Sequence, residues 1–283
     1  GTTIPLVVAN MTAISGRRMA ETTARRGGLT VIPQDIPVDV VIDTVAKVKA
    51  ASLVYDTPVT VKPHHTCGYA LGLIPKRAHG AAVVVDPDTN RPVGMVDLSD
   101  VTDVDRFTQV REVMSTELLT LPEGVDPREA FDRLRAARRK LAPVVDADGR
   151  LVGLLTRSGA VRSTIYTPAT DDDGRLRVGA AIGMNGDPAG KAAQLVAAGI
   201  DCIEHGTGLT DETIELMASR QVALVPTLVN IQTFPNIAAR AEAKYPVYAA
   251  HMRSLHQRHV DTVDKAVDAG VPVYAGTDAG GTI

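Results

Sequence analysis

Tryptophan is absent from this 283-residue chain, and aromatic residues make up only 3% of it. The core must therefore be built from Val, Leu, Ile and Ala, a composition that suits a parallel sheet covered on both faces. Two cysteines are too few for a disulfide framework. No stretch of the sequence shows the pattern of a signal peptide or forms an apolar run of ~18 residues. These absences favour a cytoplasmic globular protein.

The charges are nearly balanced, with 30 Lys and Arg against 33 Asp and Glu, a formal net charge of −3 and a pI near 6.2. Nucleic acid and anionic membranes are therefore not expected as partners. The length allows two domains, since domains typically hold ~100 to 200 residues. The sequence leaves open whether the protein forms a homo-oligomer.

Strands alternate with helices at both ends of the chain, which predicts parallel strands with right-handed crossovers. The last helix is expected to run unbroken over 236–269. A closed barrel of this type uses eight strands. The fold class expected here is α/β, an incomplete TIM-type (β/α) barrel of about six strands. These strands are expected at 4–9, 29–32, 176–182, 200–204, 222–225 and 271–275.

Residues 51–168 interrupt this alternation with an α+β insertion that repeats itself once. Two strands joined by a polar turn occur in each half, and Gly94 of the first copy lies over Gly153 of the second, 59 positions later. A helix precedes the strands of each copy, at 68–78 in the first and 126–140 in the second. Such self-similarity indicates an internal duplication.

Three stretches carry a resemblance to a known family: Ile4-Pro5-Leu6-Val7-Val8-Ala9-Asn10-Met11-Thr12-Ala13, Arg18-Met19-Ala20-Glu21 and Val178-Gly179-Ala180-Ala181-Ile182-Gly183. They are similar to the IMP dehydrogenase and GMP reductase family, and the insertion resembles that family's pair of CBS modules. The resemblance implies a barrel that binds a purine nucleotide and NADP. It also implies that the CBS pair binds adenine or guanine nucleotides as regulators.

The CBS resemblance gives candidate ribose ligands, because such a module usually presents a Thr or Ser and an Asp three residues later. Here the pair is divided between the copies. Asp97 and Asp100 hold the two positions in the first copy, and Thr156 and Gly159 hold them in the second. Nucleotide binding at the insertion is therefore expected to be weakened, and a docking or oligomerising module is the alternative.

The dehydrogenase and reductase chemistry implied by the resemblance needs a nucleophilic Cys on a loop after a later barrel strand. Neither cysteine of this chain fits that place. Cys67 falls in the insertion and Cys202 inside an expected strand, so both are expected to be buried apolar residues. The resemblance therefore predicts a protein impaired in hydride transfer on a purine nucleotide.

Residues 197–283 resemble a second family, through Glu204-His205-Gly206-Thr207 and Ala275-Gly276-Thr277-Asp278-Ala279-Gly280. They are similar to the C-terminal part of metal-dependent amidohydrolases of the imidazolonepropionase kind. The resemblance implies His205 as a zinc ligand and Asp278 as both ligand and catalytic general base. A hydrolytic zinc usually has three protein ligands, and residues 1–63 contain no histidine, so the site is expected to be incomplete.

The two resemblances meet near Asp201, at a junction of helix and strand. We therefore interpret the chain as a composite, with barrel units at 1–50 and 169–200, a tandem CBS-like insertion at 51–168 and amidohydrolase-like units at 201–283. Three hypotheses stay open. The protein is a nucleotide-responsive relative of IMP dehydrogenase and GMP reductase, a metal-dependent hydrolase, or an inactive chimera of both.

Overall fold

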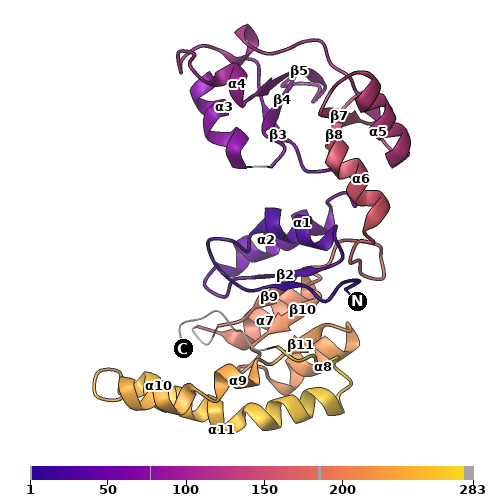
Figure 1. Ribbon diagram of the computed structural model, residues 1–283. Coiled ribbons are helices and arrows are strands. Elements are labelled where there is room, and N and C mark those ends of the chain that lie inside the picture. The colour runs from indigo at the N-terminus through magenta and orange to yellow at the C-terminus, as the bar shows by residue number, and fades with distance from the viewer. Residues whose placement is uncertain (1, 77, 184–185, 277–283) are drawn as a thin grey trace. The chain divides into compact units, whose positions relative to one another are not determined.

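A computed structural model describes residues 2–76, 78–183 and 186–276 (Figure 1). The chain forms two compact units. One unit, here called the barrel unit, comprises Gly1–Ala51 and Pro168–Ile283. The other, here called the insert, comprises Ser52–Thr167.

The barrel unit is built on a parallel sheet whose strands follow the order β1-β2-β9-β10-β11. A sixth segment continues it, because Val273 pairs in parallel with Leu224 and the Tyr274 amide donates to the Leu224 carbonyl at 2.9 Å. The α/β class and the parallel sheet predicted from the sequence are thus confirmed, with five regular strands and one bridged segment. The strands are β1 (Val7–Val8), β2 (Leu29–Ile32), β9 (Gly179–Ala181), β10 (Cys202–Glu204) and β11 (Ala223–Val225).

Helices follow the strands and pack beside one another in the same order as the strands that precede them. In α2, Val41, Val45 and Val48 recur at helical spacing and are all buried. This apolar stripe explains why the segment is a helix and which face it turns inward. The helices of this layer are α1 (Arg17–Ala24), α2 (Val38–Lys49), α7 (Pro188–Ala197), α8 (Asp211–Ser219) and α11 (Pro246–Asp268).

The prediction of a single helix over 236–269 is wrong. The structure has α9 (Leu228–Ile231), α10 (Phe234–Ala241) and α11, and the last two pack against each other. The break comes at Pro246, which lacks an amide hydrogen and is tolerated in the first turn of a helix but not in its interior. The chain therefore turns back at 242–245 and forms a helical hairpin.

The insert contains the same succession of elements twice, strand, helix, two antiparallel strands and helix. The sequence missed the first strand of each copy, since β3 and β6 have three and two residues. The first copy has β3 (Val59–Val61), α3 (Cys67–Leu73), β4 (Ala81–Val85), β5 (Pro92–Asp97) and α4 (Leu98–Val101). The second has β6 (Leu121–Pro122), α5 (Pro127–Ala136), β7 (Leu141–Val145), β8 (Leu151–Thr156) and α6 (Arg157–Ile165). A 3₁₀-helix, Ile74–Lys76, follows α3 where the sequence predicted one helix to residue 78, and another, Val110–Glu112, lies between the copies.

Irregular features of the insert recur at equivalent places in the two copies. The register of the antiparallel pair shifts between Val84 and Val85 in one copy and between Val144 and Val145 in the other. A bulge is a specific backbone feature, so its recurrence indicates that the two copies share one backbone plan.

A short segment before each copy pairs with the third strand of one of the two copies. Asp56, before the first copy, bridges to Leu154 on β8, and Ser115, before the second copy, bridges to Met95 on β5. The third strand of each copy is thus paired with a segment from outside that copy. The bridge from Asp56 also connects the start of the first copy to the second copy.

Among the residues that the structure describes, no helix is both long enough and apolar enough to cross a membrane.

Candidate functional site

A cavity of about 650 Å³ lies in the barrel unit where the parallel strands end. Each of the five strands contributes a residue from just beyond its last position: Asn10 after β1, Gln34 after β2, Ile182 after β9, His205 after β10 and Thr227 after β11. Because parallel strands end at one edge of the sheet, these side chains converge without being close in sequence. This is the edge at which barrel enzymes carry their chemistry.

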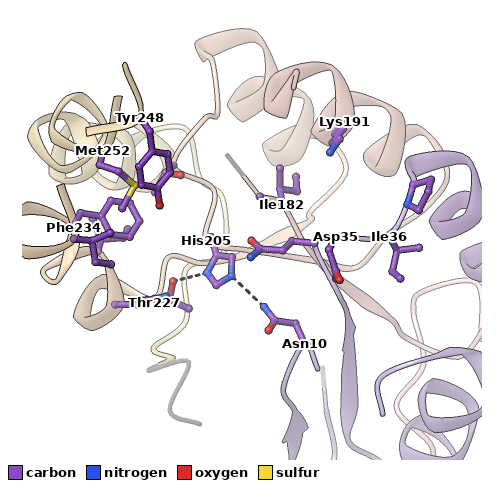
Figure 2. A pocket seen from close by; sticks show the side chains of 17 residues that line it. Asn10, Asp35, Ile36, Ile182, Lys191, His205, Thr227, Phe234, Tyr248 and Met252 are labelled. Atoms are coloured by element: carbon purple, nitrogen blue, oxygen red, sulfur yellow. Dashed lines mark hydrogen bonds between the residues drawn. The ribbon is translucent and has the colours of Figure 1, made fainter. Parts of the chain in front are cut away.

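The walls of the cavity differ in character. The helical hairpin supplies Phe234, Tyr248 and Met252, which gather on one side in Figure 2. Asp35 and Lys191 lie on the other side of the cavity from this group. A ligand in this cavity would therefore meet an aromatic and thioether wall, a polar floor of strand ends and charged groups across from the wall.

His205 lies at the centre of the cavity and is held by both ring nitrogens (Figure 2). Its Nδ1 lies 2.8 Å from Thr227 Oγ1, and its Nε2 lies 3.1 Å from Asn10 Nδ2. The Asn10 amide nitrogen also donates to Glu204 Oε2 at 3.5 Å. An amide nitrogen can only donate, so Nε2 of His205 is the acceptor in the contact with Asn10, and the Thr227 hydroxyl is the partner of Nδ1.

The backbone at these strand ends is in the left-handed region, with φ of 71° at His205, 65° at Gly206 and 46° at Thr227. His is one of the few non-glycine residues enriched there. Gly206 is required for a second reason, because a Cβ atom at this position would lie 2.6 Å from Leu224 Cδ1. The sequence His205-Gly206 therefore fits a tight turn that directs the imidazole into the cavity.

The metal site expected from the sequence has one residue in the described structure. His205 lies just beyond β10, as expected, whereas Asp278 lies outside the described residues. Within residues 2–76, 78–183 and 186–276, no group of three or more His, Cys, Asp or Glu side chains is placed to hold a metal ion. The described residues therefore do not fit a hydrolytic zinc.

The candidate ribose ligands of the insert serve as helix caps. The Asp97 carboxylate accepts from the amides of Ser99 and Asp100, and Asp100 accepts from the Asp97 amide at 2.8 Å, which completes a capping box. Hydrogen bonds from the Ser99 side chain and from these amides outweigh burial and lower the pKa of Asp97. In the other copy, Thr156 Oγ1 accepts from the Gly159 amide at 2.8 Å.

Both cysteines are buried, as the sequence predicted. Burial, with the nearby carboxylates of Glu204 and Asp201, raises the pKa of the Cys202 thiol to about 12. Burial and the Glu112 carboxylate raise the pKa of Cys67 as well. Neither thiol is suited to supply the thiolate that a covalent attack on a purine requires.

A buried ion cluster lies at the opposite ends of the strands. Lys49 Nζ, at the end of α2, is 2.6 Å from Asp201 Oδ2 and 2.9 Å from Asp171 Oδ2. Burial raises the pKa of Asp201 in spite of Lys49. Burial opposes ionisation of Asp171 too, but hydrogen bonds from Lys49 and the Arg175 amide prevail and lower its pKa. The cluster joins α2 to the start of β10.

Sequence reasoning selected His205 but missed its partners. Asn10 and Thr227 lie two positions past the ends of β1 and β11, so their places after apolar strands were a usable signal. The hairpin residues Phe234, Tyr248 and Met252 gave no such signal, because the sequence pattern suggested one continuous helix there.

Comparison with known proteins agrees with this architecture. Residues 2–260 match the model of the IMP dehydrogenase / GMP reductase domain. The chain belongs to this family. The match extends past Asp201, where the sequence suggested a change of family. It therefore covers the strand ends around the cavity, from Asn10 to Thr227 and on into the helical hairpin.

A GMP reductase of Mycobacterium tuberculosis is 55% identical to this chain over 223 residues. The aligned residues are 79% of this chain and 46% of the relative. The chain thus spans about half the length of the curated relatives it matches. The inosine-5'-monophosphate dehydrogenase of Mycobacterium leprae is 38% identical over 205 residues, 71% of this chain and 38% of the relative.

A solved structure of GMP reductase from Trypanosoma brucei in complex with guanosine 5'-monophosphate is 26% identical to the chain. The structural match covers 79% of this chain and 51% of the GMP reductase chain, with a TM-score of 0.56. A different kind of relative is an uncharacterized protein of Mycobacterium tuberculosis, 64% identical over 89 residues, 31% of this chain and 24% of the relative.

Proposed function

We propose that the barrel unit binds a purine nucleotide in the cavity at its strand ends. The observation that carries this proposal is the convergence of five strand ends on one cavity, with a polar floor and an aromatic wall. The volume of about 650 Å³ falls in the range of small-molecule sites. Family membership and the relative solved with guanosine 5'-monophosphate support a purine as the ligand.

We further propose that this chain binds the nucleotide without turning it over. Hydride transfer between a purine nucleotide and NADP in this family depends, by the resemblance, on a cysteine thiolate. Cys202 is buried and its pKa is raised to about 12, and Cys67 belongs to the insert. NADP is the cofactor that the family suggests, and the described cavity offers no thiolate beside which its hydride would act.

The test combines calorimetry with NADPH absorbance on the full chain. GMP is expected to bind with one-site saturation at the cavity, and NADPH is expected not to be oxidised in the presence of GMP above the rate without protein. Absence of GMP binding would contradict the nucleotide site. NADPH oxidation proportional to protein concentration would contradict the lack of turnover.

A second proposed function is nucleotide sensing by the insert as a CBS-type pair. It is favoured by the duplicated backbone plan, in which Asp56 and Ser115 cross to equivalent strands of the two copies. Asp97, Asp100 and Thr156 remain the proposed ribose contacts, although each also caps a helix. ATP or GTP binding that is lost in Asp97→Ala, with GMP binding retained, is the expected result.

The metal-dependent amidohydrolase and the chimera have less support. The described residues offer His205 without further ligands, and both of its ring nitrogens have protein partners. The 89-residue match to an uncharacterized protein is compatible with a composite C-terminal part. Elemental analysis after dialysis against zinc distinguishes the amidohydrolase from an inactive chimera. An amidohydrolase would retain about one zinc per chain, as a three-ligand site does.

A further inference from the structure

A second cavity of about 260 Å³, here called the side cavity, lies in the barrel unit next to the cavity at the strand ends. The loop after β10, the start of α7 and one face of α11 form its walls. Thr207 lines both cavities, so the two meet at this residue. Resting on the proposed nucleotide site, we infer that the side cavity binds the phosphate group of the nucleotide.

Helix α11 contributes to both cavities. Tyr248 and Met252 line the cavity at the strand ends. His251, Leu255 and Arg258 line the side cavity. These three residues recur at positions i, i+4 and i+7, which share one face of a helix. A nucleotide whose base lies against Tyr248 therefore has two basic side chains within the next turns of the same helix.

Arg258 differs from the other Arg and Lys residues of α11 in its charge partners. Arg253 pairs with Glu242, and Lys265 Nζ lies 2.7 Å from Asp211 Oδ1. In the described part of the chain, the Arg258 guanidinium has no carboxylate partner, and it lies at the wall of the side cavity. A guanidinium can donate to two phosphate oxygens at once, so this position suits a phosphomonoester.

The Thr207 hydroxyl is an unused hydrogen-bond donor at the place where the cavities meet. The residue is only 7% exposed, yet its hydroxyl forms no hydrogen bond with any residue that the structure describes. Buried hydroxyl groups are normally hydrogen-bonded. Because this one borders both cavities, it indicates an acceptor that a bound molecule supplies, and phosphate oxygens are such acceptors.

The loop after β10 lies close against the start of α7. A Cβ atom at Gly208 would lie 2.5 Å from Pro188 Cβ, so a residue with a side chain would not fit there. Asp187 is the one acid among the described residues that line the side cavity, and its carboxylate caps α7 by accepting from the Gly190 amide at 2.9 Å. The side-chain donors available to a phosphate are therefore those of Thr207 and of the α11 face.

The experiment measures binding of GMP, guanosine and inorganic phosphate to the full chain by calorimetry at constant ionic strength. The main variant is Arg258→Gln, which removes a charge from an exposed side chain and should leave the fold intact. The matched control is Arg240→Gln, at an exposed arginine of α10 that lines neither cavity.

GMP is expected to bind the unaltered chain more tightly than guanosine does. Arg258→Gln should weaken GMP binding roughly tenfold, as loss of a charge-assisted hydrogen bond predicts, and should leave guanosine binding unchanged. Arg240→Gln should change neither. A GMP preference that is absent from the unaltered chain, or that persists in Arg258→Gln, would overturn the phosphate site and leave the nucleotide site standing. Failure of the unaltered chain to bind both ligands would contradict the nucleotide site itself.

The hydroxyl is tested by a second pair of variants. Thr207→Val removes the hydroxyl and should weaken GMP binding roughly fivefold without affecting guanosine, whereas Thr207→Ser keeps the hydroxyl and should bind GMP as the unaltered chain does. Equal GMP affinities of the Val and Ser variants would contradict the role of the hydroxyl.

Inorganic phosphate distinguishes a site for the nucleotide's phosphate from a site for free phosphate alone. It is expected to compete with GMP and not with guanosine, because only GMP fills the side cavity. Absence of competition with GMP, or equal competition with guanosine, would show that phosphate binds elsewhere and would overturn the inference.

Discussion

Polar residues follow the strands in both units, but they make different interactions there. In the insert, β5 and β8 continue directly into α4 and α6, so Asp97 and Thr156 become the N-caps of those helices. In the barrel unit, the loop 205–210 separates β10 from α8, and His205 faces the cavity. Asp97 and Thr156 are thus bonded to the helix that follows them, whereas His205, which a loop separates from α8, lines the cavity.

The largest expected effect concerns the buried ion cluster of the barrel unit. Lys49→Met would remove the cation that Asp171 and Asp201 share, with Arg175 and Arg177 left as their ion-pair partners. Removing one partner of a buried pair costs about 3–5 kcal/mol of unfolding free energy, and the remaining arginines should keep the loss near the lower end of that range. Urea unfolding should show this loss in the barrel unit alone.

The control for the cluster is Lys47→Met, whose exposed pair with Asp43 should contribute under about 1 kcal/mol. Equal losses in the two lysine variants would show that burial does not distinguish them. Destabilisation of the insert by Lys49→Met would contradict the separate stabilisation of the two units.

The next prediction compares the two copies of the insert. A Cβ atom at Gly153 would lie 2.6 Å from Tyr55 Cβ, which is fixed to the backbone, so Gly153→Ala should cost about 1–3 kcal/mol by overpacking. At Gly94 the nearest atom is Met114 Sδ at 2.5 Å, on a flexible side chain that can move away. Thermal unfolding should therefore rank Gly153→Ala as the more destabilising, and the reverse order would contradict the packing argument.

A smaller effect is expected when a cap is removed. Thr156→Ala deprives the Gly159 amide of its acceptor and should destabilise the insert by about 1 kcal/mol. GMP affinity of the barrel unit should not change, as calorimetry can measure. A lowered GMP affinity in Thr156→Ala would place the ligand at the insert and contradict the proposed site in the barrel unit.

The smallest effect concerns thiol reactivity. With a pKa of about 12, Cys202 should stay protonated through the pH range in which an ordinary thiol, with a pKa of about 8.5, ionises. Alkylation of the folded chain should therefore not accelerate across that range, and both thiols should react after unfolding. A thiol that reacts rapidly in the folded chain would contradict the proposed lack of turnover.

Much of the fold followed from local patterns in the sequence. The buried stripe of Val41, Val45 and Val48 predicts α2, and apolar runs predict the parallel strands. The helical hairpin was mispredicted because Pro246 was counted inside a helix, although its missing amide hydrogen marks a helix start. The two-residue and three-residue strands β6 and β3 carry too few residues for a periodic pattern.

The candidate site was less predictable than the fold. His205 was found through its place after a strand, but the roles of Asn10 and Thr227 depend on which strands become neighbours in space. That neighbourhood is a property of the sheet order, in which β10 lies next to β11 and Asn10 comes from the far edge strand. A sequence motif cannot show a hydrogen bond between residues 195 positions apart.

The purine nucleotide is proposed to bind at the strand ends of the barrel unit. Hydrogen exchange of the full chain with and without GMP, resolved by peptide mass spectrometry, tests it most directly. Slower exchange is expected in segments that contain His205 and Thr227, with no change around Asp97 and Thr156. Protection confined to the insert, or absent from the whole chain, would contradict it.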